Sequence, residues 1–181
     1  MRSSRVDRLR NGIAKHVICM ALLGVLVTGG GCVGYRLGSM LPPDIKTVYV
    51  TTFANRTSEP ELESATTGAA IAEFQKDATL RVVSKLADAD TRLDVTLVGF
   101  SEQPLRYQRD RPKTANEYRI VIEAEIVFRR VSSGAVIVKK TVQGDTTFVV
   151  AGDLGSSKRG AIPEAARDLA HDIVESLVEA W

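Results

Sequence analysis

The sequence predicts a two-layer α/β (α+β) sandwich, in which a mostly antiparallel or mixed sheet of four or five strands carries two helices on one face. Two observations predict this class. Residues 93–100 and 117–128 alternate apolar and polar side chains, as strands with one buried face do. Residues 58–76 and 163–181 instead repeat apolar side chains at helical spacing, which makes a stripe that has to be buried on another layer.

Residues 1–31 have the layout of a bacterial lipoprotein signal peptide. Five Lys and Arg and one acid precede an apolar run at 17–27, and small residues then lead into Cys32. The run is shorter than the roughly 20 residues that a membrane-spanning helix needs, so cleavage is favoured over a permanent anchor. Cys32 is then expected to be lipidated, although Gly29 stands where such signals usually have Leu. Cleavage among the glycines by an ordinary signal peptidase is the alternative.

The rest of the chain has the length of one domain. Residues 32–45 are expected to be a lipidated N-terminal tether, because Pro42 and Pro43 keep the backbone extended, and residues 46–181 to be a single domain. The signal holds five of the 24 Lys and Arg and one of the 22 Asp and Glu, which leaves 19 basic against 21 acidic residues. This balance does not indicate a nucleic-acid binder.

The first part of the domain is predicted to form a strand, a turn and a helix. Residues 47–53 are β-branched and aromatic, which is typical of a strand, and Asn55 to Thr57 follow as a turn. Ser58 and Glu61 have the spacing of a capping box, so a helix is expected to begin there. Its apolar stripe is predicted to consist of Thr67, Ala70, Ile71 and Phe74.

Short and long strands are predicted to follow. Residues 80–83 form a short strand, and in the strand at 93–100 the alternation places Gly99 on the core face and Phe100 on the opposite face. The strand at 117–128 and a further strand region, split between 136–138 and 142–150, are joined by a hairpin turn at Ser132-Ser133-Gly134.

Residues 152–160 are predicted to be a polar, glycine-rich loop, and the last helix is expected to begin at Pro163. His171 and Trp181 are interpreted as packing or rim residues. The stripe that this helix would bury consists of Ile162, Ala166, Leu169, Ile173 and Leu177, with Ala170, Val174, Val178 and Trp181 beside it.

Few residues in the domain could carry out catalysis. Cys19 lies in the signal, so Cys32 is left without a disulfide partner or a Cys-based metal site. His16 is also in the signal, so a catalytic triad or zinc centre would depend on His171 alone. No nucleotide-binding, hydrolase or metalloprotease motif is present. The sequence therefore predicts a protein that is not an enzyme and uses no metal or cofactor.

One segment is unusually basic. Between two predicted long strands, residues 104–113 contain Arg106, Arg109, Arg111 and Lys113, and the segment is expected at an edge or tip of the sheet. These cations could bind a phosphorylated or anionic partner, or they could form a solvated loop that only aids solubility. Lys158 and Arg159 form a second, weaker basic pair before the last helix.

The mature chain resembles the LptE family of lipopolysaccharide-assembly lipoproteins. The order and spacing of several short segments carry the resemblance more than any single one. These segments are Cys32 with Gly34-Tyr35-Arg36-Leu37, Leu41-Pro42-Pro43 with Ile45-Lys46-Thr47-Val48, Phe53 to Thr57 with Glu59-Pro60, Glu117-Tyr118-Arg119, and Ala165 to Ala170 running on to Trp181.

The resemblance implies a non-catalytic lipoprotein that is attached to the periplasmic side of the outer membrane by lipid on its cysteine, palmitate included. It implies a large outer-membrane β-barrel partner, LptD-like, which the protein plugs and assists in delivering lipopolysaccharide to the cell surface. In the family, basic residues in two loops are implicated in lipopolysaccharide binding. The corresponding residues here are Arg106, Arg109, Arg111, Lys113, Lys158 and Arg159.

Two other functions are compatible with parts of the sequence. Small lipoproteins with a similar strand-helix-strand core regulate a cell-wall (peptidoglycan) synthase from the periplasmic side. The Gly-Tyr-Arg-Leu and Pro-Pro segments favour the lipopolysaccharide function over this one. An anchored hydrolase is disfavoured because the mature chain has a single histidine.

Overall fold

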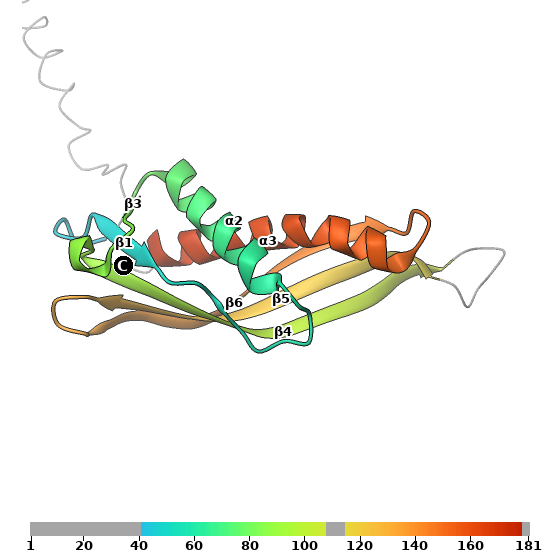
Figure 1. Ribbon diagram of the computed structural model, residues 1–181, viewed down its shortest axis with the longest axis horizontal. Coiled ribbons are helices and arrows are strands. Elements are labelled where there is room, and N and C mark those ends of the chain that lie inside the picture. The colour runs from blue at the N-terminus through green and yellow to red at the C-terminus, as the bar shows by residue number, and fades with distance from the viewer. Residues whose placement is uncertain (1–40, 108–114, 179–181) are drawn as a thin grey trace, which may run out of the picture. The chain divides into compact units, whose positions relative to one another are not determined.

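The computed structural model describes residues 41–107 and 115–178, which form a six-stranded mixed sheet with two helices on one face (Figure 1). Cys32, Arg109, Arg111, Lys113 and Trp181 lie outside these ranges. In chain order the elements are β1 (Thr47–Val50), β2 (Ala54–Asn55), α2 (Leu62–Asp77), β3 (Arg81–Val82), the 3₁₀ turn η1 (Leu86–Asp88), β4 (Thr91–Tyr107), β5 (Ala115–Arg130), β6 (Val136–Val149) and α3 (Leu154–Val178).

The strand order is β3-β1-β4-β5-β6, with β2 added beside β4. The three long strands β4, β5 and β6 are antiparallel, whereas β1 pairs in parallel with both β3 and β4. The predicted class is thus confirmed, with one strand more than the four or five expected. The two-residue strand β2 accounts for the higher number, because it is too short to show alternation in the sequence, whereas β3 lies within the short strand predicted at 80–83.

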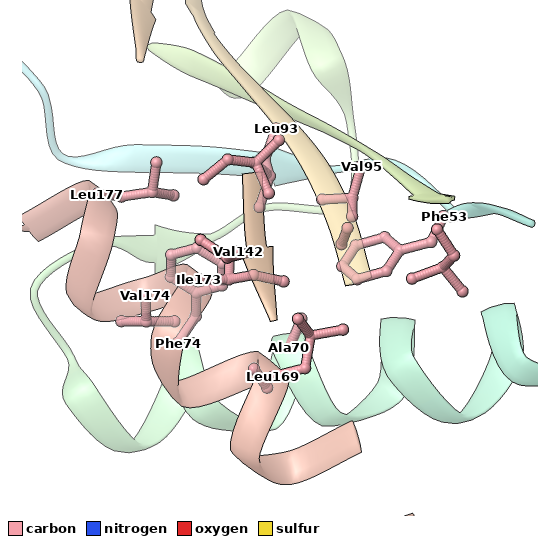
Figure 2. Close-up of a cluster of buried hydrophobic side chains, with 14 of the residues drawn as sticks. Phe53, Ala70, Phe74, Leu93, Val95, Val142, Leu169, Ile173, Val174 and Leu177 are labelled. Carbon is pink, nitrogen blue, oxygen red and sulfur yellow. The ribbon is translucent and has the colours of Figure 1, made fainter. Parts of the chain in front are cut away.

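The core lies between the sheet and the helices, as Figure 2 shows for side chains from both layers. Leu93 and Val95 of β4 and five residues of β5 are buried, which confirms the alternation predicted for 93–97 and 120–128. Helix α3 packs on β6 and β5, and α2 packs on α3 and reaches β2 and β3. Both helices therefore cover the same face, as the two apolar stripes predicted. The buried residues of β5 are Ile120, Ile122, Ala124, Ile126 and Phe128.

A β-bulge in β4 changes which side chains face the helices. Leu97 pairs with Ala124 and Gly99 with Glu123, so Val98 is the extra residue. Beyond it Phe100 pairs with the fully buried Ile122, and directly paired residues share a face. The assignment of Gly99 to the core face and of Phe100 to the opposite face was therefore wrong, because simple alternation assumes an unbroken strand.

Helix α2 begins later than the capping box predicted, at Leu62 rather than Ser58. Its N-cap is Glu61, which has a left-handed backbone (φ 61°) and makes no side-chain cap. The preceding turn is organised by Asn55, which donates to the Glu59 carbonyl and the Glu63 carboxylate, each at 2.8 Å. Asn55 also accepts from the Thr57 backbone at 2.9 Å, so side-chain bonds hold this segment in a turn and not in a helix.

The buried stripe of α2 is only partly the predicted one. Ala70 and Phe74 are buried as expected, whereas Thr67 and Ile71 are half-buried. Leu62 and Thr66 take the remaining buried positions. The stripe is therefore rotated from the one that the sequence suggested, in keeping with the later start of the helix.

Helix α3 begins nine residues before Pro163 and includes most of the segment predicted to be a loop. Asp153 caps it, because its carboxylate accepts from the Ser156 backbone at 2.8 Å, and this bond lowers the pKa of Asp153. Pro163 lies inside the helix and has no N–H to donate to the preceding turn. All five residues of the predicted main stripe are buried.

Asp90 fastens the start of β1 to the start of β4. Its carboxylate accepts from the backbone of Lys46 and Thr47, each at 3.0 Å, and from the Thr47 hydroxyl at 2.8 Å. The bond from the Lys46 backbone, followed by that from the Thr47 hydroxyl, lowers the pKa of Asp90. The stabilisation that the carboxylate provides is therefore complete above its usual pKa of 3.8 and is lost as the pH falls through the lowered value.

We expect Asp90→Ala to lower the free energy of unfolding by about 2 kcal/mol at pH 7, the range for hydrogen bonds to a charged group. Urea unfolding at pH 7 and at pH 3 measures it, and the difference from the wild type should shrink at the lower pH. Asp88→Ala is the control, because Asp88 is exposed and only its backbone bonds are seen. An equal loss in both variants would contradict the role given to Asp90.

Candidate functional site

The basic segment 104–113 begins within β4, not in a loop. Pro104 pairs with Tyr118 and Arg106 with Glu117, so β4 and β5 remain paired as far as Tyr107 and Ala115. The Arg106 side chain is 75% exposed, and its guanidinium lies 3.4 Å from the Glu117 carboxylate. Arg106 is therefore held at the end of the sheet with most of its surface open to a ligand.

Lys158 is placed differently, in the second turn of α3 and among other side chains. Its ammonium lies 2.8 Å from the Glu59 carboxylate and 3.1 Å from the Glu102 carboxylate. It also sits 5.6 Å from the centroid of the Phe100 ring, close enough for a cation–π interaction. The hydrogen bond to Glu59 is the main cause that raises the pKa of Lys158, against the opposing effect of burial.

Three segments far apart in the sequence meet at Lys158. Glu59 comes from the turn before α2, Glu102 from β4, and Lys158 from α3, and only 13–26% of each side chain is exposed. The bulge at Val98 makes this possible, since it turns Phe100 and Glu102 toward the helices. No sequence pattern indicated this cluster, because a bulge and a contact between residues 99 positions apart leave no local signal.

Arg159 follows directly but points elsewhere. It is exposed, and its guanidinium donates to the Ser156 hydroxyl at 3.1 Å. A groove of about 620 Å³ runs between the turn before α2 and the first turns of α3, and Lys158 and Arg159 both line it. Its other lining residues include Pro60, Glu61, Ile162 and Pro163.

The two basic segments lie toward the same end of the sheet. Lys158 contacts Glu102, and Arg106 is four residues further along β4, a separation of about 13 Å in an extended strand. Arg106, Lys158 and Arg159 therefore all lie toward one end of the sheet. Arg106 shares the face of Glu117, which is opposite the helices, whereas Glu102 and Lys158 lie on the helix side. Arg106 and Arg159 are open to solvent, and Lys158 is engaged by two carboxylates.

The contact between His171 and Glu73 is structural. His171 of α3 has Nδ1 3.3 Å from the Glu73 carboxylate of α2 and a side chain that is 61% exposed, so it lies at the rim of the contact between the two helices. Within residues 41–107 and 115–178, no three His, Cys, Asp or Glu side chains are grouped so that they could hold a metal ion. None of the helices described there is long and apolar enough to cross a membrane.

Comparison with known proteins gives both a family and a fold. The model of the family described as "LptE: Lipopolysaccharide-assembly" matches residues 45–177. A search of curated proteins finds no match. Among solved structures, the chain is similar to protein XCC0632 from Xanthomonas campestris, with a TM-score of 0.54 and 10% identity over 76% of this chain and 88% of that one. It is also similar to the hypothetical protein CT253 from Chlamydia trachomatis, with a TM-score of 0.52 and 10% identity over 74% and 95% of the two chains.

Proposed function

Because the chain belongs to the LptE family of lipopolysaccharide-assembly proteins, we propose that it binds lipopolysaccharide and assists a large outer-membrane β-barrel in placing it at the cell surface. The match over residues 45–177 is the observation that carries this proposal. The protein acts as a binding and assembly factor without catalysis or a cofactor. Acyl chains on Cys32 hold it to the periplasmic side of the outer membrane, and the domain plugs the barrel.

The phosphates of lipopolysaccharide bind to cations at the end of the β4–β5 hairpin and the start of α3. Arginine can donate two parallel N–H groups to one phosphate, so an exposed arginine at a strand end is a suitable donor. Arg106 and Arg159 are exposed and supply such donors, with Lys158 next to Arg159 in α3. Arg109, Arg111 and Lys113 belong to the proposed site by sequence and lie outside the described residues.

The partner can be identified by copurification. The proposal predicts that a large β-barrel protein copurifies with the tagged full-length chain when outer membranes are extracted in mild detergent. Recovery of a peptidoglycan synthase instead would favour the regulator function. Recovery of no partner, together with no affinity for lipopolysaccharide, would contradict both.

We expect the quadruple variant Arg106→Ser, Arg109→Ser, Arg111→Ser, Lys113→Ser to bind lipopolysaccharide at least about tenfold more weakly at low salt. Each exposed charge contact is worth at most about 1 kcal/mol, so the effect should emerge only when several are removed. The loss should shrink at high salt, which screens the contacts. Titration at two salt concentrations measures it, and thermal unfolding should change little. Arg159→Ser should add to the loss.

The matched control removes four exposed cations elsewhere, so that the net charge changes equally. Replacing Arg81, Lys85, Lys139 and Lys140 by Ser serves this purpose. If the control variant lost as much affinity for lipopolysaccharide, net charge alone would explain the effect of the quadruple variant. Lys158→Ser is tested as a separate variant, because it also breaks two ion pairs. Its melting temperature has to be measured with its affinity, so that a loss of binding can be distinguished from a loss of stability.

A further inference from the structure

Lys158 is already bound by two carboxylates of the protein. Its ammonium lies 2.8 Å from the Glu59 carboxylate and 3.1 Å from the Glu102 carboxylate, and its side chain is 22% exposed. One ammonium against two carboxylates gives this cluster a formal charge of −1. A phosphate that approached Lys158 would meet this net negative charge and would have to displace partners that are themselves partly buried. The cluster is therefore a poor phosphate site.

The part of α3 that carries Lys158 has a low intrinsic tendency to form a helix. It contains Gly155 and Gly160, and inside a helix glycine is less favourable than any residue except proline. Pro163 follows and has no N–H to bind the carbonyl four residues earlier, so one bond between this part and the rest of the helix is missing. Contacts with other elements are therefore needed to keep residues 154–162 helical.

Lys158 supplies contacts with two other elements. Glu59 comes from the turn before α2, and Glu102 comes from β4. The Phe100 ring, also of β4, has its centroid 5.6 Å from the ammonium. Consecutive side chains of a helix point about 100° apart, so an anchored Lys158 also fixes the direction of Arg159.

Arg159 contacts a different set of residues and is exposed. Its guanidinium donates to the Ser156 hydroxyl at 3.1 Å, and a Cβ added at Gly155 would lie 3.6 Å from its Nη1. The guanidinium therefore lies over the first turn of α3, and Arg159 also lines the groove beside the turn before α2. Because Glu59 belongs to that turn, its ion pair with Lys158 fixes the two walls of the groove relative to each other.

We infer that Lys158 is a positioning residue, which holds the first part of α3 so that Arg159 can bind phosphate, and that it does not bind phosphate itself. The two neighbouring cations, both predicted to bind lipopolysaccharide, then have different roles. This inference rests on the proposed function and narrows it to the cations that are open to the ligand. Without Lys158, residues 154–162 should lose part of their helical order, and Arg159 its fixed direction.

Removal of Glu59 and Glu102 distinguishes the two roles by the sign of the change. In Glu59→Ala with Glu102→Ala the chain becomes more positive by two charges, and a phosphate-binding Lys158 would lose its competitors. Affinity for rough-type lipopolysaccharide would then rise. We expect the opposite, about fivefold weaker binding by the full-length chain at low salt, because Arg159 loses its position. Fivefold is about the most that one exposed charge contact contributes. Lys158→Met should weaken binding by the same factor.

Combined changes and amide hydrogen exchange give two further readouts. Arg159→Ser alone should weaken binding about fivefold, and in Lys158→Met it should weaken binding little further, because both changes remove the same contact. Two independent phosphate-binding cations would instead lose about 25-fold together. Lys158→Arg keeps a cation between the carboxylates and should bind as the wild type does. Exchange at residues 154–162 should become faster in Lys158→Met and stay unchanged in Arg159→Ser.

The matched control is Glu123→Ala with Glu125→Ala. Both residues are exposed on the face of β5 away from the helices, and this variant changes the net charge by the same amount. It should bind lipopolysaccharide at least as tightly as the wild type does, with unchanged hydrogen exchange at residues 154–162.

Three results would overturn the inference and leave the proposed function intact. One is tighter binding by the variant without Glu59 and Glu102. The others are additive losses for Lys158→Met and Arg159→Ser, and unchanged exchange at residues 154–162 in Lys158→Met. If the wild type does not bind lipopolysaccharide, the proposed function fails and the inference falls with it, and this result differs from all the others.

Discussion

Replacement of Gly144 by Ala is expected to destabilise the protein by about 3 kcal/mol or more. Gly144 lies in β6 where α3 crosses it, and an added Cβ would stand 2.1 Å from the Leu169 nitrogen and 2.4 Å from its Cα. Overpacking of a core usually costs about 1–3 kcal/mol when side chains can adjust. Here the obstacle is helix backbone, so α3 has to move away from the sheet. Urea unfolding of Gly144→Ala measures the loss.

Gly68→Ala is the matched control for this prediction. Gly68 lies within α2, is exposed, and would have nothing within 4 Å of an added Cβ. Alanine is a better helix former than glycine by about 1 kcal/mol, so this variant should be slightly more stable than the wild type. A loss at Gly144 no larger than the change at Gly68 would contradict the close contact between β6 and α3.

Replacement of Phe74 by Ala is expected to lower the free energy of unfolding by about 3–5 kcal/mol, the range for deleting a buried aromatic ring. Phe74 is 1% exposed on the inner side of α2, and Figure 2 shows it beside Ile173 and Val174 of α3. Its ring fills the space where the two helices meet, and α3 cannot close that space without leaving the sheet. Thermal or urea unfolding measures the loss.

The neighbouring Gln75 provides the control, because it is exposed on the same helix turn. Gln75→Ala should change stability by less than about 0.5 kcal/mol. If Phe74→Ala lost no more than this, the ring would not contribute to holding the two helices together.

Regular, strongly amphipathic elements could be predicted from the sequence. The alternation at 120–128 marks one buried face correctly, because every second side chain of β5 meets the helices. The stripe of α3 was also predicted correctly, since a helix buried along one side repeats at 3.6 residues. Such patterns arise from burial itself, so the side chains that they mark as apolar are the ones buried in the fold.

Element boundaries and breaks in pattern could not be predicted in the same way. Gly152, Gly155 and Gly160 indicated a loop, but the Asp153 cap and packing on the sheet extend α3 through two of them. Propensity is a weak signal that tertiary contacts override. The bulge at Val98 has no signature in composition, so the face of every residue after it could not be known.

The sequence predicted the basic character of the candidate site but only part of its arrangement in the fold. The basic composition of 104–113 is visible in the sequence, and Arg106 is exposed where the segment begins. Lys158 was expected in a polar, glycine-rich loop, yet it lies in a helix between two carboxylates from distant segments. Long-range ion pairs depend on the fold, so the sequence could not distinguish this engaged lysine from the open Arg159 beside it.

The position of β6 at the margin of the sheet bears on aggregation. A 14-residue strand whose outer backbone groups are free can pair with a strand of another molecule. In β6 the Asp145 backbone N–H already donates to the Asp168 carboxylate of α3 at 2.8 Å. Lys139 and Lys140 are exposed along the same strand, and lysines on an edge discourage such pairing. The same strand that supports α3 is thereby guarded against intermolecular sheet growth.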